Sequence, residues 1–156
     1  MKISTRIRYG LRTMVEIASG NESESVFQKD IAENQNLSNK YLDQIIHSLK
    51  IAGLIRDAKG RKSGYVVARK PEEISVYDIY RAFEPDINFV NCLTAGFKCE
   101  RQDICQARGF WAQLNNLVTC YLKSVSLNDV INRNIGFEEV GFFDNIRKCE
   151  SGMHGK

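Results

Sequence analysis

Apolar residues recur at helical spacing in three successive stretches before position 53, and this pattern restricts the fold more than any other feature of the chain. The first stretch begins near Ser4 and ends at Gly20, which is typical of one amphipathic helix. Ser25 followed by Gln28 has the spacing of a capping box and predicts a second, short helix that ends near Asn34. The apolar residues expected on the inner sides of these two helices are Ile7, Leu11, Met14, Val15, Ala18, Phe27, Ile31 and Ala32.

A third helix is predicted from Ser38, which can cap it, to about Ala52, where Gly53 ends it. The stretch 36–38 before it has the composition of a tight turn. At 100° per residue, this helix separates an apolar side from a polar side. The apolar side holds Leu42, Ile45, Ile46 and Leu49, and the polar side holds Lys40, Asp43, Gln44 and His47. Two short helices joined in this way describe a helix-turn-helix, and an ordinary helical hairpin is the alternative.

The next segment favours the DNA-binding interpretation. Residues 54–58 and 65–69 have the pattern of two short strands, and a glycine-bounded loop connects them. This loop carries three cations, Lys59, Arg61 and Lys62. Cationic side chains at such a tip can enter a minor groove or hold phosphates, so we expect a winged helix-turn-helix. A solvated basic hairpin is the alternative.

Charge is distributed unevenly along the chain. The first 70 residues hold 13 Lys and Arg against 7 Asp and Glu, a surplus of +6, whereas the remaining 86 hold 9 against 12. The N-terminal part is therefore the expected contact for a polyanion such as double-stranded DNA, although a solvated surface has the same charge. No apolar run approaches the ~18 residues of a membrane-spanning helix, and the first 20 residues lack the apolar core of a signal peptide. We accordingly expect a cytoplasmic protein with no membrane contact and with reduced thiols.

The second half of the chain is expected to carry a fourth helix and a long helix after the cysteines. The spacing of Ile74, Tyr77, Ile79, Tyr80 and Phe83 predicts a fourth helix that ends at Glu84-Pro85. From Gln106, apolar residues alternate by threes and fours over two heptads, which is typical of a helix that packs against a partner. We expect this seam to form a homodimer, with packing inside one subunit as the alternative. The seam consists of Trp111, Leu114, Val118, Leu122 and Val125, with Tyr121 as an alternative to Leu122.

These features divide the chain into three parts. Residues 1–70 are the predicted winged helix-turn-helix domain, and residues 71–133 hold a linker helix, a cysteine loop and the dimerisation helix. A short last helix is expected to start at Ser126. Residues 134–156 show no periodicity and are expected to form a partly disordered tail that is frayed from Glu150 to Lys156.

Three cysteines, Cys92, Cys99 and Cys105, lie within fourteen residues of a polar, loop-like segment. Thiolates spaced by six and five residues can converge on an iron-sulfur cluster or on a tetrahedral zinc ion. The absence of closely spaced CxxC pairs favours the cluster, and buried free cysteines are the remaining alternative. No fourth ligand is obvious. The candidates are Glu100, Asp103, Cys149, His47 and His154, while Cys120 on the seam helix is expected to be part of the core.

Taken jointly, several motifs resemble the iron-sulfur-cluster-sensing winged-helix transcriptional regulators of the IscR/NsrR type over residues 1–133. The carriers are the opening Met-Lys-Ile-Ser-Thr with Arg8-Tyr9-Gly10-Leu11, Asp30-Ile31-Ala32, Leu37-Ser38, Tyr41-Leu42-Asp43-Gln44, Ala52-Gly53-Leu54-Ile55, the wing from Gly60 to Tyr65, and the three cysteines followed by Trp111. The resemblance implies a three-cysteine cluster that changes operator affinity and a dimer formed by the helix after the loop. It also implies that Ser38, Lys40, Tyr41, Asp43 and Gln44 face the major groove and that Lys59 faces the minor groove.

The departures from this family leave the cluster type open between 2Fe-2S and 4Fe-4S. One branch places a histidine ligand three residues after the last cysteine, where this chain has Arg108, which cannot ligate a metal. Another branch, closer in the Glu84-Pro85 and Val90-Asn91-Cys92 stretches, can take a carboxylate from the start of the partner chain, yet this chain has Arg8 there. A third branch works without a cluster, so a thiol-switch or zinc-site repressor is the alternative function.

We therefore predict a mainly α fold with a small β wing and a long dimerisation helix. The expected function is a homodimeric DNA-binding transcriptional regulator, with repression as the expected mode, and the expected cofactor is an iron-sulfur cluster. No nucleophile-base pair or phosphate-cradling glycine motif indicates an enzyme. The candidate DNA contacts are Tyr9, Gln28, Ser38, Asn39, Lys40, Tyr41, Asp43, Gln44, Lys59, Arg61 and Lys62, and the candidate metal ligands are Cys92, Cys99 and Cys105.

Overall fold

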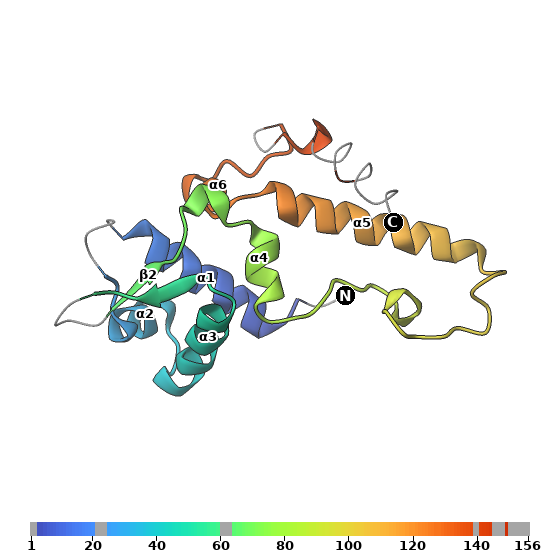
Figure 1. Ribbon diagram of the computed structural model, residues 1–156. Helices are drawn as coiled ribbons and strands as arrows, with labels where there is room; N and C mark the ends of the chain where they lie inside the picture. Colours follow the sequence, from blue (N-terminus) through green and yellow to red (C-terminus); the bar gives the residue numbers. More distant parts are fainter. Residues whose placement is uncertain (1–2, 21–24, 60–63, 139–140, 145–148, 150–156) are drawn as a thin grey trace.

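The computed structural model describes residues 3–20, 25–59, 64–138, 141–144 and 149. Helices dominate, and a single small antiparallel sheet is present in this part of the chain, so the predicted fold class is confirmed. The helices and strands in chain order are α1 (Thr5–Ser19), α2 (Gln28–Gln35), α3 (Asn39–Ile51), β1 (Ile55–Asp57), β2 (Tyr65–Val67), the 3-10 turn η1 (Pro71–Glu73), α4 (Val76–Arg81), the 3-10 turn η2 (Asn91–Leu93), α5 (Gln106–Ser124) and α6 (Leu127–Asn132). In Figure 1, α1 to α3 and the strands form one body, and α5 extends away from it.

Local capping explains where the first three helices begin and end. The Ser4 hydroxyl accepts a hydrogen bond from the Ile7 amide at the start of α1, and α1 ends at Gly20. Asn36 adopts the left-handed conformation after α2, which turns the chain between the two helices. The Ser38 hydroxyl then accepts from the Tyr41 amide, 3.3 Å away, and starts α3. The predicted helix-turn-helix boundaries are confirmed at these positions.

The start of α2 differs from the prediction. The capping box predicted at Ser25 is absent, because α2 begins at Gln28 and the residue before it, Phe27, makes no side-chain cap. The backbone around Val26 instead exchanges two hydrogen bonds with Tyr65, at 3.1 and 2.8 Å. Extended backbone that pairs with the wing cannot also form the first turn of a helix, so Ser25 lies outside it. Phe27, expected on the apolar side of this helix, is 36% exposed.

The wing forms as predicted, with shorter strands. Ile55 pairs with Val67 and Asp57 pairs with Tyr65 in an antiparallel register. Gly53 has a φ of +67°, a conformation that other residues adopt at a cost, and this turns the chain from α3 directly into β1. The predicted tip residues Arg61 and Lys62 lie outside the described residues.

A continuous hydrophobic core joins the helix-turn-helix to later elements. Two antiparallel backbone hydrogen bonds tie the starts of α4 and α6 together, from Val76 N to Val125 O at 2.9 Å and from Leu127 N to Ile74 O at 2.7 Å. Each of these helices starts with a complete capping box, and α6 packs against α1. The core consists of Met14, Ile17, Ile31, Ala32, Leu42, Ile45, Ile46, Leu49, Leu54, Ile55, Ile74, Ile79 and Leu127.

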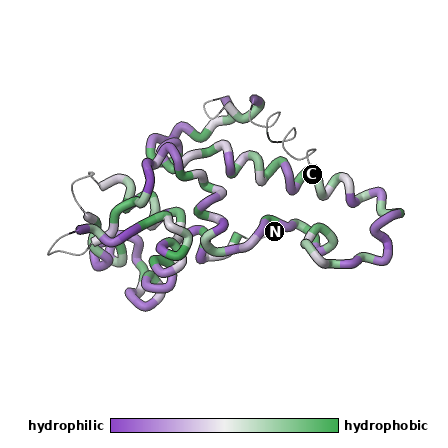
Figure 2. The backbone as a smooth tube through the Cα atoms, in the orientation of Figure 1, coloured by the Kyte–Doolittle hydropathy of each residue, from purple (hydrophilic) through white to green (hydrophobic). Residues whose placement is uncertain are grey.

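Helix α5 contacts α4 through one side. Figure 2 shows hydrophobic and hydrophilic residues interspersed along its whole length. Within the described ranges, no helix is both long enough and apolar enough to cross a membrane.

The C-terminal segment, residues 134–149, was predicted as part of a partly disordered tail, and its described residues include contacts with α5. Phe142 is buried, and its ring lies 5.6 Å from the ring of Tyr121 and 4.8 Å from that of Phe137. Cys149 forms a disulfide with Cys120, so the expectation of reduced thiols was wrong for this pair in this structure. Cys120 is buried, as predicted. The stretch 150–156, expected to be frayed, lies outside the described residues.

Candidate nucleic-acid interface and cysteine loop

One side of α3 is free to contact a ligand. Leu42, Ile46 and Leu49 lie in the core and fix the rotation of the helix about its axis, as its periodicity predicted. The opposite side carries the exposed residues Ser38, Asn39, Lys40, Asp43, Gln44 and His47. These side chains present amide, hydroxyl, ammonium, carboxylate and imidazole groups, the kinds of group that read base edges and hold phosphates.

Two of the predicted DNA contacts are hydrogen-bonded to each other. Gln28 on α2 donates from Nε2 to Oδ1 of Asp43 on α3, at 2.6 Å. Its Oε1 accepts from the hydroxyl of Tyr65 on β2, at 3.0 Å. The three side chains therefore link α2, α3 and the wing in one polar network. This arrangement sets the wing relative to the recognition helix, a role that no local sequence signal indicated for Tyr65.

A second contact holds the other end of the recognition surface. The rings of Tyr9 and Tyr41, both half-buried, meet edge to face with centroids 5.9 Å apart. The guanidinium of Arg12 lies 5.2 Å from the Tyr9 ring and donates to Oε1 of Gln35 at 2.7 Å. Tyr9 and Tyr41 thus help to hold α3 against α1, in addition to their predicted role as DNA contacts.

The base of the wing is fixed to α3 by a cation. Lys50 forms an ion pair with Asp57 on β1 at 2.7 Å and lies 4.9 Å from the centre of the Tyr65 ring. Lys59 is exposed at the end of the described hairpin. Arg56 on β1 is also exposed. It was not predicted as a DNA contact, because one cation within a strand gives no distinct sequence signal.

The body of the winged helix meets α4 through an unusually close contact. A Cβ placed on Gly10 of α1 would lie less than 3.0 Å from two ring atoms of Phe83, so only glycine allows this approach. The guanidinium of Arg6 lies 5.9 Å from the centre of the same ring and donates to the Ser48 hydroxyl of α3 at 3.4 Å. Phe83, two residues beyond the end of α4, is therefore connected to the recognition helix through the side chains of Arg6 and Ser48.

The segment after α4 is attached to α5 before the cysteines begin. Asp86 pairs with Arg81 at 2.7 Å, Ile87 is buried, and the Phe89 amide donates to Oδ1 of Asn115 on α5 at 3.3 Å. Burial, with Glu84 nearby, raises the pKa of the Tyr80 phenol above its usual value of 10.0. The cysteine loop, residues 90–105, therefore starts from an anchored point and ends where α5 begins. In Figure 1 the segment that follows α4 extends alongside α5 toward its N-terminal end.

The three cysteines of this loop are free thiols. Cys92 and Cys99 are half-buried and Cys105 is exposed. In the part of the chain that the structure describes, no three Cys, His, Asp or Glu side chains lie close enough together to hold a metal ion. The loop thus supplies the donor atoms that an iron-sulfur cluster takes, but it does not bring them together in this conformation. Nε of Arg108, at the position where the resemblance implies a histidine in one branch, is buried without a hydrogen-bond partner among the described residues.

The predicted dimerisation residues fall into two groups. Trp111, Leu114, Val118 and Leu122 are half-buried by their own chain. Val125 is 3% exposed and packs with Phe142, so its side chain belongs to the core of its own subunit. The most exposed apolar side chains of α5 are Phe110, at 61%, and Leu117, at 45%. They are seven residues apart and therefore lie on one face, beside Leu114.

Comparison with known proteins identifies the kind of molecule. The model of the Rrf2 family, described as an iron-dependent transcriptional regulator, matches residues 3–133. The HTH-type transcriptional regulator CymR of Bacillus subtilis is 34% identical over 143 residues, covering 92% of this chain and 99% of that protein. The structure of IscR of T. potens has 32% identity and a TM-score of 0.69, covering 85% of this chain and 88% of that one. The oxidised form of Staphylococcus aureus CymR has 34% identity and a TM-score of 0.66, covering 84% and 96%.

These relatives are transcriptional regulators, so the prediction of a DNA-binding, non-enzymatic role is confirmed, as is the resemblance stated from the motifs. The chain belongs to the Rrf2 family of winged-helix transcriptional regulators.

Proposed function

We propose that this regulator is a homodimeric repressor whose affinity for its DNA operator depends on the state of the cysteine loop. The observation that carries this proposal is the anchoring of the loop at both ends: the residue before it, Phe89, is hydrogen-bonded to α5, and α5 begins directly after Cys105. A change in the loop therefore acts on the helix that follows and on the connection between Phe83 and α1. Action on operator DNA implies a cytoplasmic protein.

The DNA contacts divide into two classes. The exposed face of α3, above all Gln44, would read base edges in the major groove, because an amide can form two hydrogen bonds with adenine. Lys59, Arg61 and Lys62 of the wing, together with Lys40, would contact phosphates or the minor groove. Residues 1–70 thus serve as the DNA-contacting part, residues 71–133 as the regulatory and dimerising part, and residues 134–156 as a tail.

Cys92, Cys99 and Cys105 would hold an iron-sulfur cluster, either 2Fe-2S or 4Fe-4S. Such a cluster, when bound, supplies a group that nitric oxide, oxygen or shortage of iron can alter or remove. To bring three thiolates together, the loop must close from the conformation described above. Because its two ends are anchored, that closure would restrain the first turn of α5 and the segment before Cys92.

The dimer would form through the exposed apolar face of α5, with Phe110 and Leu117 at its centre and Trp111, Leu114, Val118 and Leu122 at its side. A two-fold axis through this face would present two recognition helices to paired half-sites. Leu117→Asp places a charge in the proposed interface and should convert the dimer to monomer in analytical ultracentrifugation. Asn116→Asp, at an exposed position 100° around the helix from Leu117, is the matched control and should leave the dimer intact.

A second candidate is a cluster-free thiol switch or zinc-site repressor on the same scaffold. The specific observation in its favour is that all three cysteines are free thiols. They do not lie together as a set of metal ligands in the described residues. Similarity to both CymR and IscR is compatible with either mechanism.

One experiment separates these candidates. The protein is purified without oxygen, its absorption spectrum is recorded, its iron, sulfide and zinc are quantified, and its affinity for operator and random duplexes is measured. A brown protein with stoichiometric iron and sulfide, whose colour and operator response disappear in the C92S/C99S/C105S variant, supports the cluster. A colourless protein that binds zinc or responds to oxidants supports the second candidate. Equal, weak affinity for both duplexes in every state contradicts the proposed function.

A further inference from the structure

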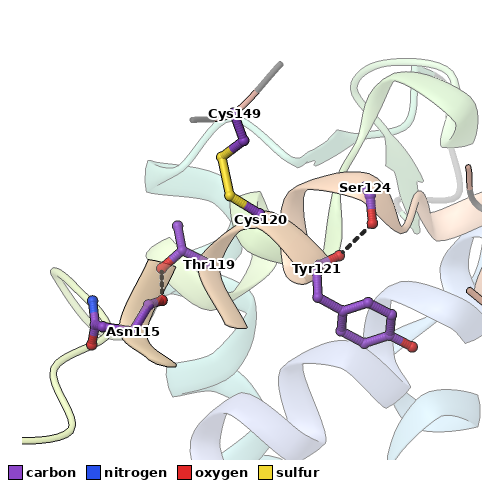
Figure 3. The surroundings of a disulfide bond; sticks show 6 residues. All are labelled: Asn115, Thr119, Cys120, Tyr121, Ser124 and Cys149. Carbon is purple, nitrogen blue, oxygen red and sulfur yellow. Dashed lines mark hydrogen bonds between the residues drawn. A yellow bond between two sulfur atoms is a disulfide. The ribbon is translucent and has the colours of Figure 1, made fainter. Parts of the chain in front are cut away.

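Two cysteines outside the cysteine loop meet at the far end of α5. Cys120 lies in the last turns of this helix and is 3% exposed, and Cys149 comes from the C-terminal segment and is half-buried. Their sulfur atoms are bonded, with Cα atoms 6.2 Å apart and a sequence separation of 29. Figure 3 shows the bond projecting from the helix on a different side from the Tyr121 ring.

In the described part of the chain, few other contacts hold the C-terminal segment. Phe142 is buried against Val125, Tyr121 and Val130, and the Tyr121 hydroxyl donates to the Ile135 carbonyl at 3.1 Å. The neighbouring aromatic rings add little burial, because Phe137 is 53% exposed and Phe143 is 65% exposed. One buried ring provides modest attachment for such a segment, so a covalent bond to α5 changes how firmly it is held.

We propose that Cys120 and Cys149 form a reversible dithiol–disulfide site, separate from the cysteine loop, that fastens the C-terminal segment to α5 when the cell is exposed to low-molecular-weight disulfides. In a reducing cytoplasm the pair is a dithiol. The regulator would then respond to thiol oxidation at a second place, toward the opposite end of α5 from Cys105.

The reaction is a pair of thiol–disulfide exchanges. Cys149 is the more exposed partner, so its thiolate attacks one sulfur of a small disulfide such as oxidised glutathione, which forms a mixed disulfide and releases one thiol. The Cys120 thiolate then attacks the Cys149 sulfur and displaces the second thiol. Two electrons pass from the two cysteines to the small disulfide, and the two protons that the cysteines lose end on the two released thiols.

The site is tested on the full-length protein equilibrated in mixtures of reduced and oxidised glutathione, quenched in acid, alkylated and mapped by mass spectrometry. We expect Cys120 and Cys149 to lose alkylation together and to appear as one linked peptide pair. The C105S variant should retain this linkage, which separates the result from the state of the cysteine loop. Pairing of Cys149 with Cys92, Cys99 or Cys105 in comparable yield would overturn the proposal, as would a Cys120 that stays alkylated while Cys149 is oxidised.

Attachment of the segment is tested by chymotrypsin, which cleaves after Phe137, Phe142 and Phe143. Cleavage there should be about tenfold slower in the oxidised than in the reduced protein, because cleavage follows the population of the detached segment. The C120A and C149A variants serve as separate controls and should be cleaved at the reduced rate in both conditions. Equal cleavage of the oxidised and reduced wild-type protein would refute the fastening role even if the bond forms.

Discussion

Replacing Gly10 by alanine tests the contact that connects the winged helix to α4. At an ordinary position inside a helix, the change from glycine to alanine stabilises the protein by about 1 kcal/mol. Here the added Cβ would lie less than 3.0 Å from Cε2 and Cζ of Phe83 and 3.2 Å from Cδ2. Overpacking of this kind costs about 1 to 3 kcal/mol, and the ring is stiff and half-buried. The two effects together should make Gly10→Ala lower the free energy of unfolding by up to about 2 kcal/mol.

Urea denaturation of four proteins measures this effect: wild type, G10A, F83L and the double variant. In the F83L background the ring is gone, so G10A should become neutral or stabilising, with a coupling energy of about 1 kcal/mol or more. Gly109 on α5 offers a matched control, because a Cβ there meets nothing within 4 Å, and G109A should stabilise by about 0.5 to 1 kcal/mol. If G10A stabilises as much as G109A, the close approach between α1 and Phe83 is wrong.

Four further predictions concern the DNA surface and the disulfide. Gln44→Ala should weaken the preferred operator by about 1 to 3 kcal/mol and leave random DNA unaffected, as measured by fluorescence anisotropy. Lys59→Ala should weaken all duplexes alike and reduce the slope of log affinity against log salt by about 0.9, and a sequence-selective effect would contradict its phosphate role. Tyr65→Phe removes one hydrogen bond of the network between α2, α3 and the wing, so unfolding should become easier by about 0.5 to 1.5 kcal/mol and operator discrimination should fall. Closing the loop between Cys120 and Cys149 should make the oxidised protein about 3 to 4 kcal/mol more stable than the reduced one, a difference that calorimetry should not find in C149A.

Periodicity predicted the recognition helix because the same residues that give α3 its amphipathic pattern, such as Leu42 and Leu49, are the ones that the fold buries. Gly53 and Ser38 marked its ends through backbone conformation and capping, which are local properties. Such signals depend on residues within one or two turns of each other. The face of α3 that offers Gln44 to a ligand could therefore be identified from the sequence alone.

Features that depend on distant residues gave no comparable signal. Backbone pairing between Val26 and Tyr65 has no side-chain signature, and the serine two residues before Phe27 suggested a helix cap in its place. Contact between Gly10 and Phe83 joins residues that lie 73 positions apart, and a glycine in a helix is compatible with several explanations. Phe142 is one of three phenylalanines in a stretch without periodicity, so its burial against Val125 was not predictable from spacing.

The contacts on either side of α4 suggest how a change in the cysteine loop reaches DNA. The Phe83 ring lies against the α1 backbone at Gly10. Because glycine has no side chain that could change its rotamer, displacement of Phe83 must either move α1 or separate α1 from α4. Arg6 lies on the same ring and bonds to Ser48, one helical turn beyond Gln44 on α3. Fully buried side chains fix α3 in the core. A displacement of α1 should therefore shift the recognition helix as a rigid body and leave its secondary structure intact. Regulation through this route would change the spacing and tilt of two recognition helices in a dimer, so it should alter affinity for paired half-sites more than affinity for a single half-site.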